Sequence, residues 1–406
     1  MPDTTVPMQT HAESRRFWLL AAFGALVTLM GLAAAHLMEE HGHVITGMDN
    51  QVVWGLPHVF AIFMIVAASG VLNVASVGSV FGHAAYKKRA PLSGLLSLAL
   101  LAGGLMVLML DLGRPERVVI AATRYNFTSM FAVNVFLYSG LAGIVAVYLW
   151  TMFERRLAPW SRPAGVAVMV WRFVLTTGTG AIFGFLVARQ AYQSALLPPL
   201  FVVMSFAWGL AVFLVVQQAM LAWNGRTLVP EVERRLARLL AVFVALALYF
   251  VAVLHLTNLY YARQGAFEAF VLLGHGGGGT FALLFWLGFV VLGSALPFAL
   301  LLAPRGQGVT SGGHATLVAS LLVVLGAFAF LYVFIVGGQA FPLEIFPGYA
   351  ATSSFGDGQV AHYVPSWPEL ALGVGGLGAA FLLTTIGVHV LDFMPPDDAP
   401  AVDAKA

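Results

Sequence analysis

The stretch that decides the fold runs from Trp54 to Gly70 and reads WGLPHVFAIFMIVAASG. His58 is its only ionisable side chain, and the apolar run continues to residue 82. A helix needs about 20 predominantly apolar residues to cross the hydrocarbon core of a bilayer. We therefore expect residues 53–82 to form a membrane-spanning helix.

The rest of the chain has the same character. Of its 406 residues, 60% are hydrophobic and only 9% are charged, and the mean hydropathy is +0.88. Soluble domains carry about 25% charged residues, so this protein cannot cover a water-facing surface of normal polarity. The net charge is only +2, so the protein lacks the strongly basic surface that nucleic-acid binding requires. The composition predicts an all-α polytopic membrane protein whose surface contacts lipid, and it excludes the soluble classes.

Cysteine is absent from the sequence. The chain therefore has no disulfide, no cysteine-ligated zinc and no iron–sulfur cluster of its own. Any iron–sulfur cluster that works with this chain must belong to a partner, and we expect no metal site within it.

Ten stretches are long enough to cross a bilayer. They are roughly residues 16–37, 53–82, 92–112, 128–152, 165–188, 198–223, 236–262, 280–303, 315–338 and 369–391. A weak internal repeat, in which Leu92–Leu96 aligns with Leu236–Leu240, suggests two four-helix units with two added helices. The expected organisation is an amino tail (1–14), a first four-helix unit with the candidate site (15–152), a second four-helix unit (153–303), two additional helices with a long periplasmic loop (304–393) and a disordered tail (394–406).

Basic residues in alternate connections predict the orientation, because cytoplasmic loops carry the excess of lysine and arginine. One side holds fourteen: Arg15, Arg16, Lys87, Lys88, Arg89, Arg155, Arg156, Arg162, Arg226, Arg234, Arg235, Arg238, Arg305 and Lys405. The other side holds five: Arg114, Arg117, Arg124, Arg189 and Arg263. We therefore expect a multi-pass protein of the bacterial cytoplasmic membrane with both termini in the cytoplasm.

Asp111 is the most informative ionisable residue, because a charge near the bilayer centre costs on the order of 2.5–3.5 kcal/mol and by default marks a functional site. It ends the third expected span and is followed by Arg114 and Arg117. One interpretation is an interfacial aspartate that pairs with an arginine and only marks the helix end. The other is a carboxylate that the guanidinium groups keep charged and that exchanges a proton at the mouth of a cavity.

His58 is expected about one turn inside the second span, because Pro57 suits the first turn of a helix. The topology puts Asp111 at a similar depth on the next helix, so the two side chains can border one site. The alternative is a hydrogen-bonded interior histidine without a function.

Further polar residues lie at the same outer level or deeper. His36 ends the first span, Tyr125 and Asn126 begin the fourth, and Gln339 ends the ninth. Four other residues are candidates for a proton path, although snorkelling and interhelical hydrogen bonds explain such residues as well. They are Arg172, His255, Asn134 and Tyr138.

Two motifs carry a family resemblance. The run Trp54–Phe63, followed by Ala68–Gly70, resembles the membrane subunits of the NrfD/polysulfide reductase family. The run Asp111–Arg117 resembles the third-helix signature of that family. Within the family, the ten expected spans and Asn126–Ser129 are most similar to the membrane subunits of DsrMKJOP-type sulfur-metabolism complexes. The resemblance covers most of residues 15–390.

The resemblance implies a heme-free, quinone-binding membrane subunit that works only within an oxidoreductase complex. Family members dock a ferredoxin-like iron–sulfur subunit near the quinone, and here the docking face would be periplasmic. DsrMKJOP-type complexes also contain a cytochrome c subunit, a heme b membrane subunit and a cytoplasmic iron–sulfur subunit. The implied activity is electron exchange between the quinone pool (menaquinone or ubiquinone) and the periplasmic partner in dissimilatory sulfur metabolism.

Quinone chemistry suits the residues that are present in the sequence. Quinone reduction takes two electrons and two protons, so the protein must supply hydrogen bonds and proton exchange. We assign proton exchange and catalysis to Asp111 and His58. The expected quinone-binding set is His58, Asp111, Arg114, Tyr125, Asn126 and His36.

Three other functions stay open at this stage. A transporter or ion channel also fits ten spans, although transporters favour broken helices with midplane sites. A heme b anchor fits the common depth of His36, His58 and His255. A purely structural anchor fits less well, because Asp111 and Arg172 lie within the membrane.

Overall fold

The computed structural model describes residues 15–124, 126–303, 309–343, 358–391, 393 and 399–400. Within them, ten helices are long and apolar enough to cross a membrane. The long elements are α1 (Arg15–His41), α2 (Leu56–Ser79), α4 (Ala90–Leu110), α6 (Met130–Phe153), α7 (Ser161–Gly184), α8 (Leu197–Trp223), α9 (Pro230–Tyr260), α11–η5–α12 (Gly279–Leu283, Leu284–Ala295, Leu296–Leu302), α13–η6–α14 (Val309–Leu331, Tyr332–Gly337, Gly338–Ala340) and α15 (Trp367–Val390), where η5 and η6 are π-helical. The all-α membrane fold class is confirmed.

Short elements complete the described chain. They are η1 (His43–Ile45), α3 (Ala84–Lys87), η2 (Pro115–Arg117), α5 (Val118–Thr123), η3 (Arg155–Trp160), α10 (Gly265–Leu273), η4 (His275–Gly277) and the antiparallel pair β1 (Arg226–Thr227) and β2 (Ala399–Pro400). The expected amino tail 1–14 and most of the expected disordered tail 394–406 lie outside the described residues.

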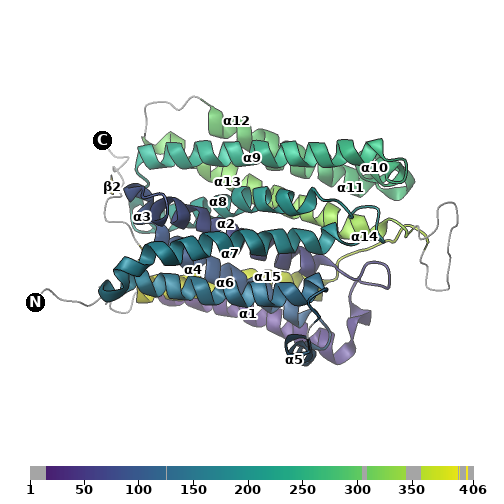
Figure 1. Cartoon of the computed structure of the whole chain (residues 1–406), viewed down its shortest axis with the longest axis horizontal. Coiled ribbons are helices and arrows are strands. Elements are labelled where there is room, and N and C mark those ends of the chain that lie inside the picture. Colours follow the sequence, from purple (N-terminus) through teal and green to yellow (C-terminus); the bar gives the residue numbers. More distant parts are fainter. Residues whose placement is uncertain are drawn as a thin grey trace, which may run out of the picture.

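The long helices run side by side along one axis, so the connections gather at two ends (Figure 1). One end carries α3 and β2, and the other carries α5, α10 and α14. We call the second one the α5 end. It holds the connection 42–55, named the strap from here on, together with the connections 111–129 and 185–196.

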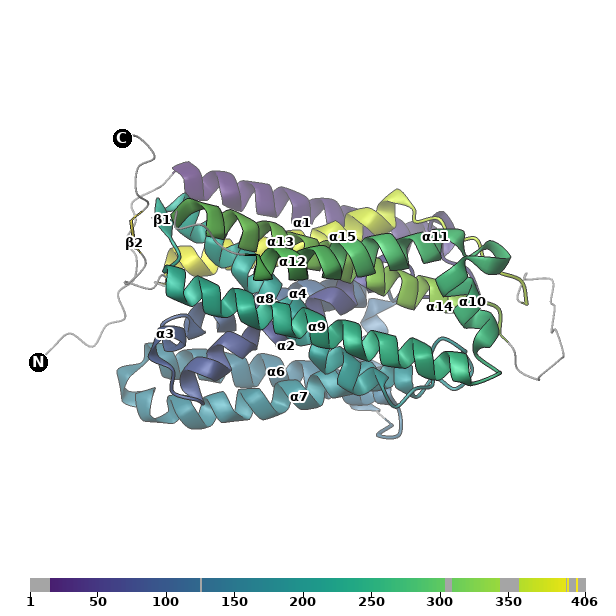
Figure 2. The same cartoon turned by 90° about the horizontal axis from the view of Figure 1, so that it is seen from above.

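Helix α2 occupies the centre of the bundle because it is apolar on all sides, which is typical of a helix that other helices surround. It packs against α4, α8, α15 and α7. Figure 2 shows α1 and α15 along one flank and α6 and α7 along the opposite flank. The outward face of α1 presents exposed apolar side chains such as Trp18 and Leu26, as a lipid-facing helix does.

The two helices that follow the second expected unit do not pack as a pair. Helix α13 packs on η5 and α8, whereas α15 packs on α1 and α4 of the first expected unit. Helix α7, which begins the second expected unit, also packs on α6 of the first. The division into two four-helix units therefore stays a prediction from the repeat.

Glycines let the central helices approach closely, as small residues do in membrane proteins. A Cβ atom on Gly209 of α8 would lie 2.2 Å from the carbonyl carbon of Gly70 in α2. A Cβ atom on Gly31 of α1 would lie 2.6 Å from the Cα atom of Gly375 in α15. These contacts bring α8 close to α2 and α1 close to α15, while α4 packs along α2.

Candidate functional site

Asp111 and His58 meet at the α5 end, as expected from their equal depth. Asp111 is the residue that caps the end of α4, and His58 lies in the first turn of α2. His58 Nδ1 lies 2.8 Å from Asp111 Oδ2. The Asp111 side chain is only 1% exposed and that of His58 is 13% exposed. The packing of α2 against α4 thus brings a buried carboxylate against an imidazole.

A second imidazole, which the sequence analysis did not single out, completes the cluster. His43 of the strap places Nε2 at 3.0 Å from the Asp111 backbone oxygen and at 3.9 Å from Asp111 Oδ1. Gly113 makes room for the ring, since a Cβ atom there would lie 2.9 Å from His43 Cε1. The histidines His36, His41 and His43 are close in sequence, and their spacing alone does not reveal which of them reaches Asp111.

The side chains that face the Asp111 carboxylate are the imidazoles of His58 and His43, and not the arginines expected from the sequence. Arg114 and Arg117 are both exposed, and neither pairs with Asp111 within the described residues. The chain turns at Gly113, whose φ of +69° suits glycine, and then enters η2. This turn carries the arginines away from the carboxylate.

Interaction with Asp111 changes the titration of His43. Hydrogen bonding to Asp111, which outweighs partial burial, raises the pKa of His43 above its usual value. The negative charges of Asp111 and Glu369 act in the same direction.

An aromatic wall lies against His58. The Trp54 ring lies 6.0 Å from the His58 ring between centroids, with an interplanar angle of 29°. Trp54 also meets Phe183 edge-to-face at 5.7 Å and Phe131 at 5.9 Å. These rings provide an apolar surface beside the polar cluster, which suits a flat, mostly apolar ligand.

Gln339 holds the part of the strap that carries Trp54. Its Oε1 accepts hydrogen bonds from the backbone N–H groups of Val53 (3.1 Å) and Trp54 (3.0 Å), and its Nε2 donates to the Trp54 carbonyl (3.0 Å). The Arg189 guanidinium donates to the backbone carbonyls of Gln339 and Gln51, both at 2.7 Å. The strap is thus tied to the end of α14 by partly buried hydrogen bonds.

Glu369 of α15 anchors the other part of the strap. Its fully buried carboxylate accepts hydrogen bonds from Gly47 N (2.9 Å), Ser366 N (2.7 Å) and the Tyr363 hydroxyl (2.5 Å). The Tyr363 hydroxyl oxygen in turn accepts from Leu56 N at 2.6 Å, at the first residue of α2. Burial and the hydrogen bond to Glu369 raise the pKa of Tyr363 well above its usual value.

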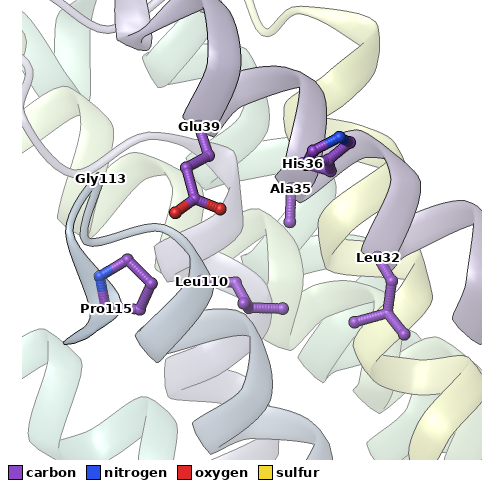
Figure 3. Close-up of a pocket in the computed structure, with 7 residues that line it drawn as sticks. All are labelled: Leu32, Ala35, His36, Glu39, Leu110, Gly113 and Pro115. Atoms are coloured by element: carbon purple, nitrogen blue, oxygen red, sulfur yellow. The ribbon is translucent and has the colours of Figure 1, made fainter.

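A cavity of about 100 Å³ lies beside the cluster, between α1 and the end of α4 (Figure 3). Its lining consists of Leu32, Ala35, His36, Glu39, Leu110, Gly113 and Pro115. The Glu39 carboxylate points toward the loop that holds Gly113 and Pro115. His36 pairs with Glu40 at 3.3 Å on the surface and borders this cavity, not the Asp111 carboxylate.

The two remaining residues of the expected binding set do not join the cluster in the described structure. Tyr125 lies outside the described residues. Asn126 is exposed, and its Oδ1 accepts hydrogen bonds from the backbone N–H (3.0 Å) and the hydroxyl (2.7 Å) of Thr128. Its side chain therefore supports its own turn.

A further buried carboxylate lies in α10, between the expected spans 236–262 and 280–303. Glu268 is fully buried, with Oε2 at 2.6 Å from His255 Nδ1, and its Oε1 accepts a hydrogen bond from Asn258 at 2.8 Å. A cavity of about 20 Å³ adjoins His255 and Asn258. The apolar residues Phe267 and Phe270, both buried, are the sequence signal for a packed helix there.

The other expected proton-path residues lie elsewhere in the bundle. Arg172 Nη1 donates to Asn73 Oδ1 at 2.6 Å, and Asn134 Nδ2 donates to the Gly178 carbonyl at 3.1 Å. Tyr138 is buried in α6. Within the described part of the chain, no hydrogen bond links Arg172, Asn134 or Tyr138 directly to His255, and the proton path stays a prediction.

The Asp111 cluster fits a ligand that offers hydroxyl or carbonyl groups. Both Asp111 carboxylate oxygens and His58 Nδ1 are buried, with Oδ2 and Nδ1 facing each other at 2.8 Å, whereas Oδ1 lies 3.9 Å from His43 Nε2 and has room for a closer partner. Buried polar atoms of this kind call for a partner, because native proteins satisfy nearly all of theirs. A quinone headgroup, flat and with two oxygens, matches these atoms and the neighbouring aromatic wall.

Comparison with known proteins gives the family. The family model described as polysulphide reductase, NrfD, matches residues 44–343. The chain is 30% identical over 392 residues to the integral membrane subunit of an Hdr-like menaquinol oxidoreductase from Archaeoglobus fulgidus, and the match covers 95% of each protein. It is 28% identical over 319 residues to a component of the polysulfide reductase of Wolinella succinogenes, and that match covers 72% of this chain and 96% of the relative.

A third relative is a putative dimethyl sulfoxide reductase membrane subunit from Halobacterium salinarum. It is 27% identical over 413 residues, with coverage of 93% of this chain and 92% of the relative. The family match spans well over half of the chain and includes His58 and Asp111. The chain belongs to the NrfD polysulphide reductase family, whose relatives named here are components of oxidoreductases.

Proposed function

We propose that this NrfD-family chain is the quinone-reactive membrane subunit of a redox complex and exchanges electrons between the membrane quinone pool and an iron–sulfur partner. The observation that most directly supports this proposal is the buried Asp111 carboxylate, which lies between two imidazoles at one end of the bundle. The relative named as part of a menaquinol oxidoreductase supports a quinone, and favours menaquinone over ubiquinone.

Each residue of the cluster has a task in this proposal. A bound quinone carries two electrons and two protons when it is reduced. His58 forms a hydrogen bond to a headgroup oxygen, Asp111 exchanges a proton, and the Trp54 ring packs on the headgroup and excludes water. His36 lines the adjacent cavity, and Arg114 and Asn126 are exposed.

The electrons must leave through a partner, because a protein without cysteine cannot hold an iron–sulfur cluster by thiolates. We assign this role to a ferredoxin-like subunit on the periplasmic face. A cytochrome c subunit, a heme b membrane subunit and a cytoplasmic iron–sulfur subunit complete the proposed complex, which serves dissimilatory sulfur metabolism. The relative from Wolinella succinogenes, named as part of a polysulfide reductase, supports a sulfur substrate.

The pairing of the histidines bears on the heme b alternative. His36, His58 and His255 pair with three different carboxylates, those of Glu40, Asp111 and Glu268. The pairs of His58 and His255 use Nδ1 and leave Nε2 for another ligand, so the heme-free proposal rests on the family resemblance and not on these pairs. An absorbance spectrum of the isolated subunit tests the point, and stoichiometric heme b would overturn the heme-free assignment.

The expected orientation places the α5 end in the periplasm of a bacterial cytoplasmic membrane, with both termini in the cytoplasm. It rests on the excess of basic residues at the opposite end. Reporter fusions placed after Met48 and after Gly358 are expected to report a periplasmic location. A cytoplasmic signal from either fusion would contradict the orientation.

The His255–Glu268 pair supports a second, narrower proposal, namely a protonatable site apart from the quinone. The pair is buried, and the adjoining cavity of about 20 Å³ is large enough for one water molecule. Of the residues expected to form a proton path, His255 is the one that lies against a buried carboxylate, which can accept a proton. We propose that the His255–Glu268 pair takes part in proton translocation, which is the only part of the transporter alternative that we retain.

The His58→Ala variant tests the proposed function through ligand content. The complex is purified with its native partners, and its quinone is extracted and quantified per iron–sulfur partner. We expect the unmodified complex to retain quinone and His58→Ala to lose most of it, because a hydrogen bond and the surface beside Trp54 are removed. Equal quinone content in a fully assembled variant complex would refute the assignment of His58.

A further inference from the structure

We propose that His43 carries protons between Asp111 and the water at the α5 end. The inference rests on the proposed function, because it gives the Asp111 proton a route that bypasses the membrane interior. The sequence motifs that carry the family resemblance do not include His43.

The solvent exposure of Asp111, His58 and His43 indicates which side chain can pass a proton to water. The Asp111 side chain is 1% exposed, so water does not reach its carboxylate directly. His58 is 13% exposed and lies against the Trp54 ring. His43 is 34% exposed while it contacts Asp111, so it is the member of the cluster that meets both the carboxylate and water.

The strap holds the His43 ring in a position to relay a proton. The backbone carbonyl of His43 accepts hydrogen bonds from the hydroxyl (2.6 Å) and N–H (3.0 Å) of Thr46, which fixes the backbone. Nε2 faces Asp111, whereas Nδ1 lies beside Gly113, where a Cβ atom would come within 3.2 Å of it. An imidazole can accept a proton at one nitrogen and release another from the second.

The proton balance is complete for quinol oxidation. Asp111 accepts the proton set free when a quinol O–H bond breaks, while the electrons pass to the iron–sulfur partner. His43, with its own proton on Nδ1, then takes a proton from Asp111 at Nε2 and gives the Nδ1 proton to water. The ring regains the Nδ1–H form by turning or by proton exchange with water, after which the second proton of the quinol follows the same route. Quinone reduction runs every step in reverse.

The distance between the two groups sets a condition on the transfer. His43 Nε2 and Asp111 Oδ1 lie 3.9 Å apart, whereas direct transfer needs about 2.6–3.2 Å or one bridging water. A small movement of the exposed ring, or a single water molecule beside it, closes this gap. The 3.0 Å hydrogen bond to the Asp111 carbonyl needs a proton on Nε2, so it holds the ring next to Asp111 in the form that follows proton transfer.

Charged groups face His43 from several elements. Asp111 faces it from α4, the Glu369 charge acts on it from α15, and His58 shares Asp111 with it. Hydrogen bonding to Asp111 raises the pKa of His43 above its usual value. Because His43 must be neutral to accept a proton from Asp111, release of quinol protons through it slows as the pH falls below this pKa.

The test compares His43→Asn with His41→Asn in the native complex. His41 is an exposed histidine two residues away, and its Nδ1 lies 3.1 Å from the Leu37 carbonyl. The probe is 2,3-dimethyl-1,4-naphthoquinol, and turnover, KM and retained quinone are measured across pH with and without added imidazole. We expect His43→Asn to lower kcat roughly 10-fold, less than removal of a direct acid–base group, with KM and quinone content unchanged.

Imidazole rescue separates the relay from a structural role. Free imidazole can carry protons to the exposed space left by the ring, so it should restore much of the His43→Asn rate and leave His41→Asn unaffected. Unchanged kcat in His43→Asn, or a loss that imidazole does not restore, would overturn the relay. Failure of the proposed function is distinguishable, because Asp111→Asn would then also turn over normally.

Discussion

Replacement of Asp111 by Asn is expected to slow quinone-linked turnover by about 10²-fold per assembled complex, the lower range for a general acid–base group. Asparagine has the same shape and retains hydrogen-bonding atoms, but it cannot accept a proton. The complex is expected to assemble, because the side chain is still in contact with His58 and the His43 contact to the backbone oxygen is unaffected. Assembled complex and quinone-linked rate are measured on the same sample.

The matched control for this variant is Glu116→Gln. Glu116 is an exposed carboxylate of η2, five residues further along the same connection. The same loss of charge there should leave turnover unchanged. A purely structural Asp111 predicts the opposite pattern, with less assembled complex and a normal rate in what survives, and that pattern would refute the proton-exchange role.

Replacement of Gln339 by Leu is expected to loosen the strap and to weaken quinone retention by roughly 10-fold or more. The change leaves the partly buried backbone N–H groups of Val53 and Trp54 without their acceptor, and the cost for each is below the about 1–3 kcal/mol of a fully buried unsatisfied group. Trp54 then no longer holds its position against His58. Limited proteolysis of the strap and quinone content of the purified complex report the two effects.

Gln217→Leu is the control for the loss of a buried glutamine. Gln217 lies inside α8, and neither polar atom of its side chain has a hydrogen-bond partner within the described residues. The same substitution there removes an unsatisfied polar group and should be neutral or stabilising. If Gln339→Leu behaves like Gln217→Leu in both measurements, the strap does not depend on Gln339.

Much of the fold could be predicted because a bilayer imposes a simple requirement on every span. Runs such as 53–82 must be apolar for about 20 residues, so the number of spans follows from the sequence. The neighbours of each span are harder to predict, since lipid and protein interiors are equally apolar. The pairing of α15 with α1 depends on glycines such as Gly31 and Gly375, whose partners are distant in sequence.

The candidate site was predictable where helix geometry alone fixed it. His58 and Asp111 lie at one depth on consecutive spans, so their proximity followed from topology. His43 and Glu268 were missed because a strap and a short helix position them, and those depend on contacts with Glu369, Gln339 and the ends of other helices. The expectation that arginines pair with Asp111 was wrong because the positive φ of Gly113 redirects the backbone.

The most direct test of the central claim is photolabelling of the native complex with an azido-naphthoquinone, followed by mapping of the labelled peptides by mass spectrometry. A headgroup bordered by His58 and Asp111 predicts label on the strap and the start of α2 and on the segment around the end of α4. Excess unlabelled 2,3-dimethyl-1,4-naphthoquinone should suppress that label. Suppressible label confined to other segments, such as those around His255 and Glu268, would contradict the account.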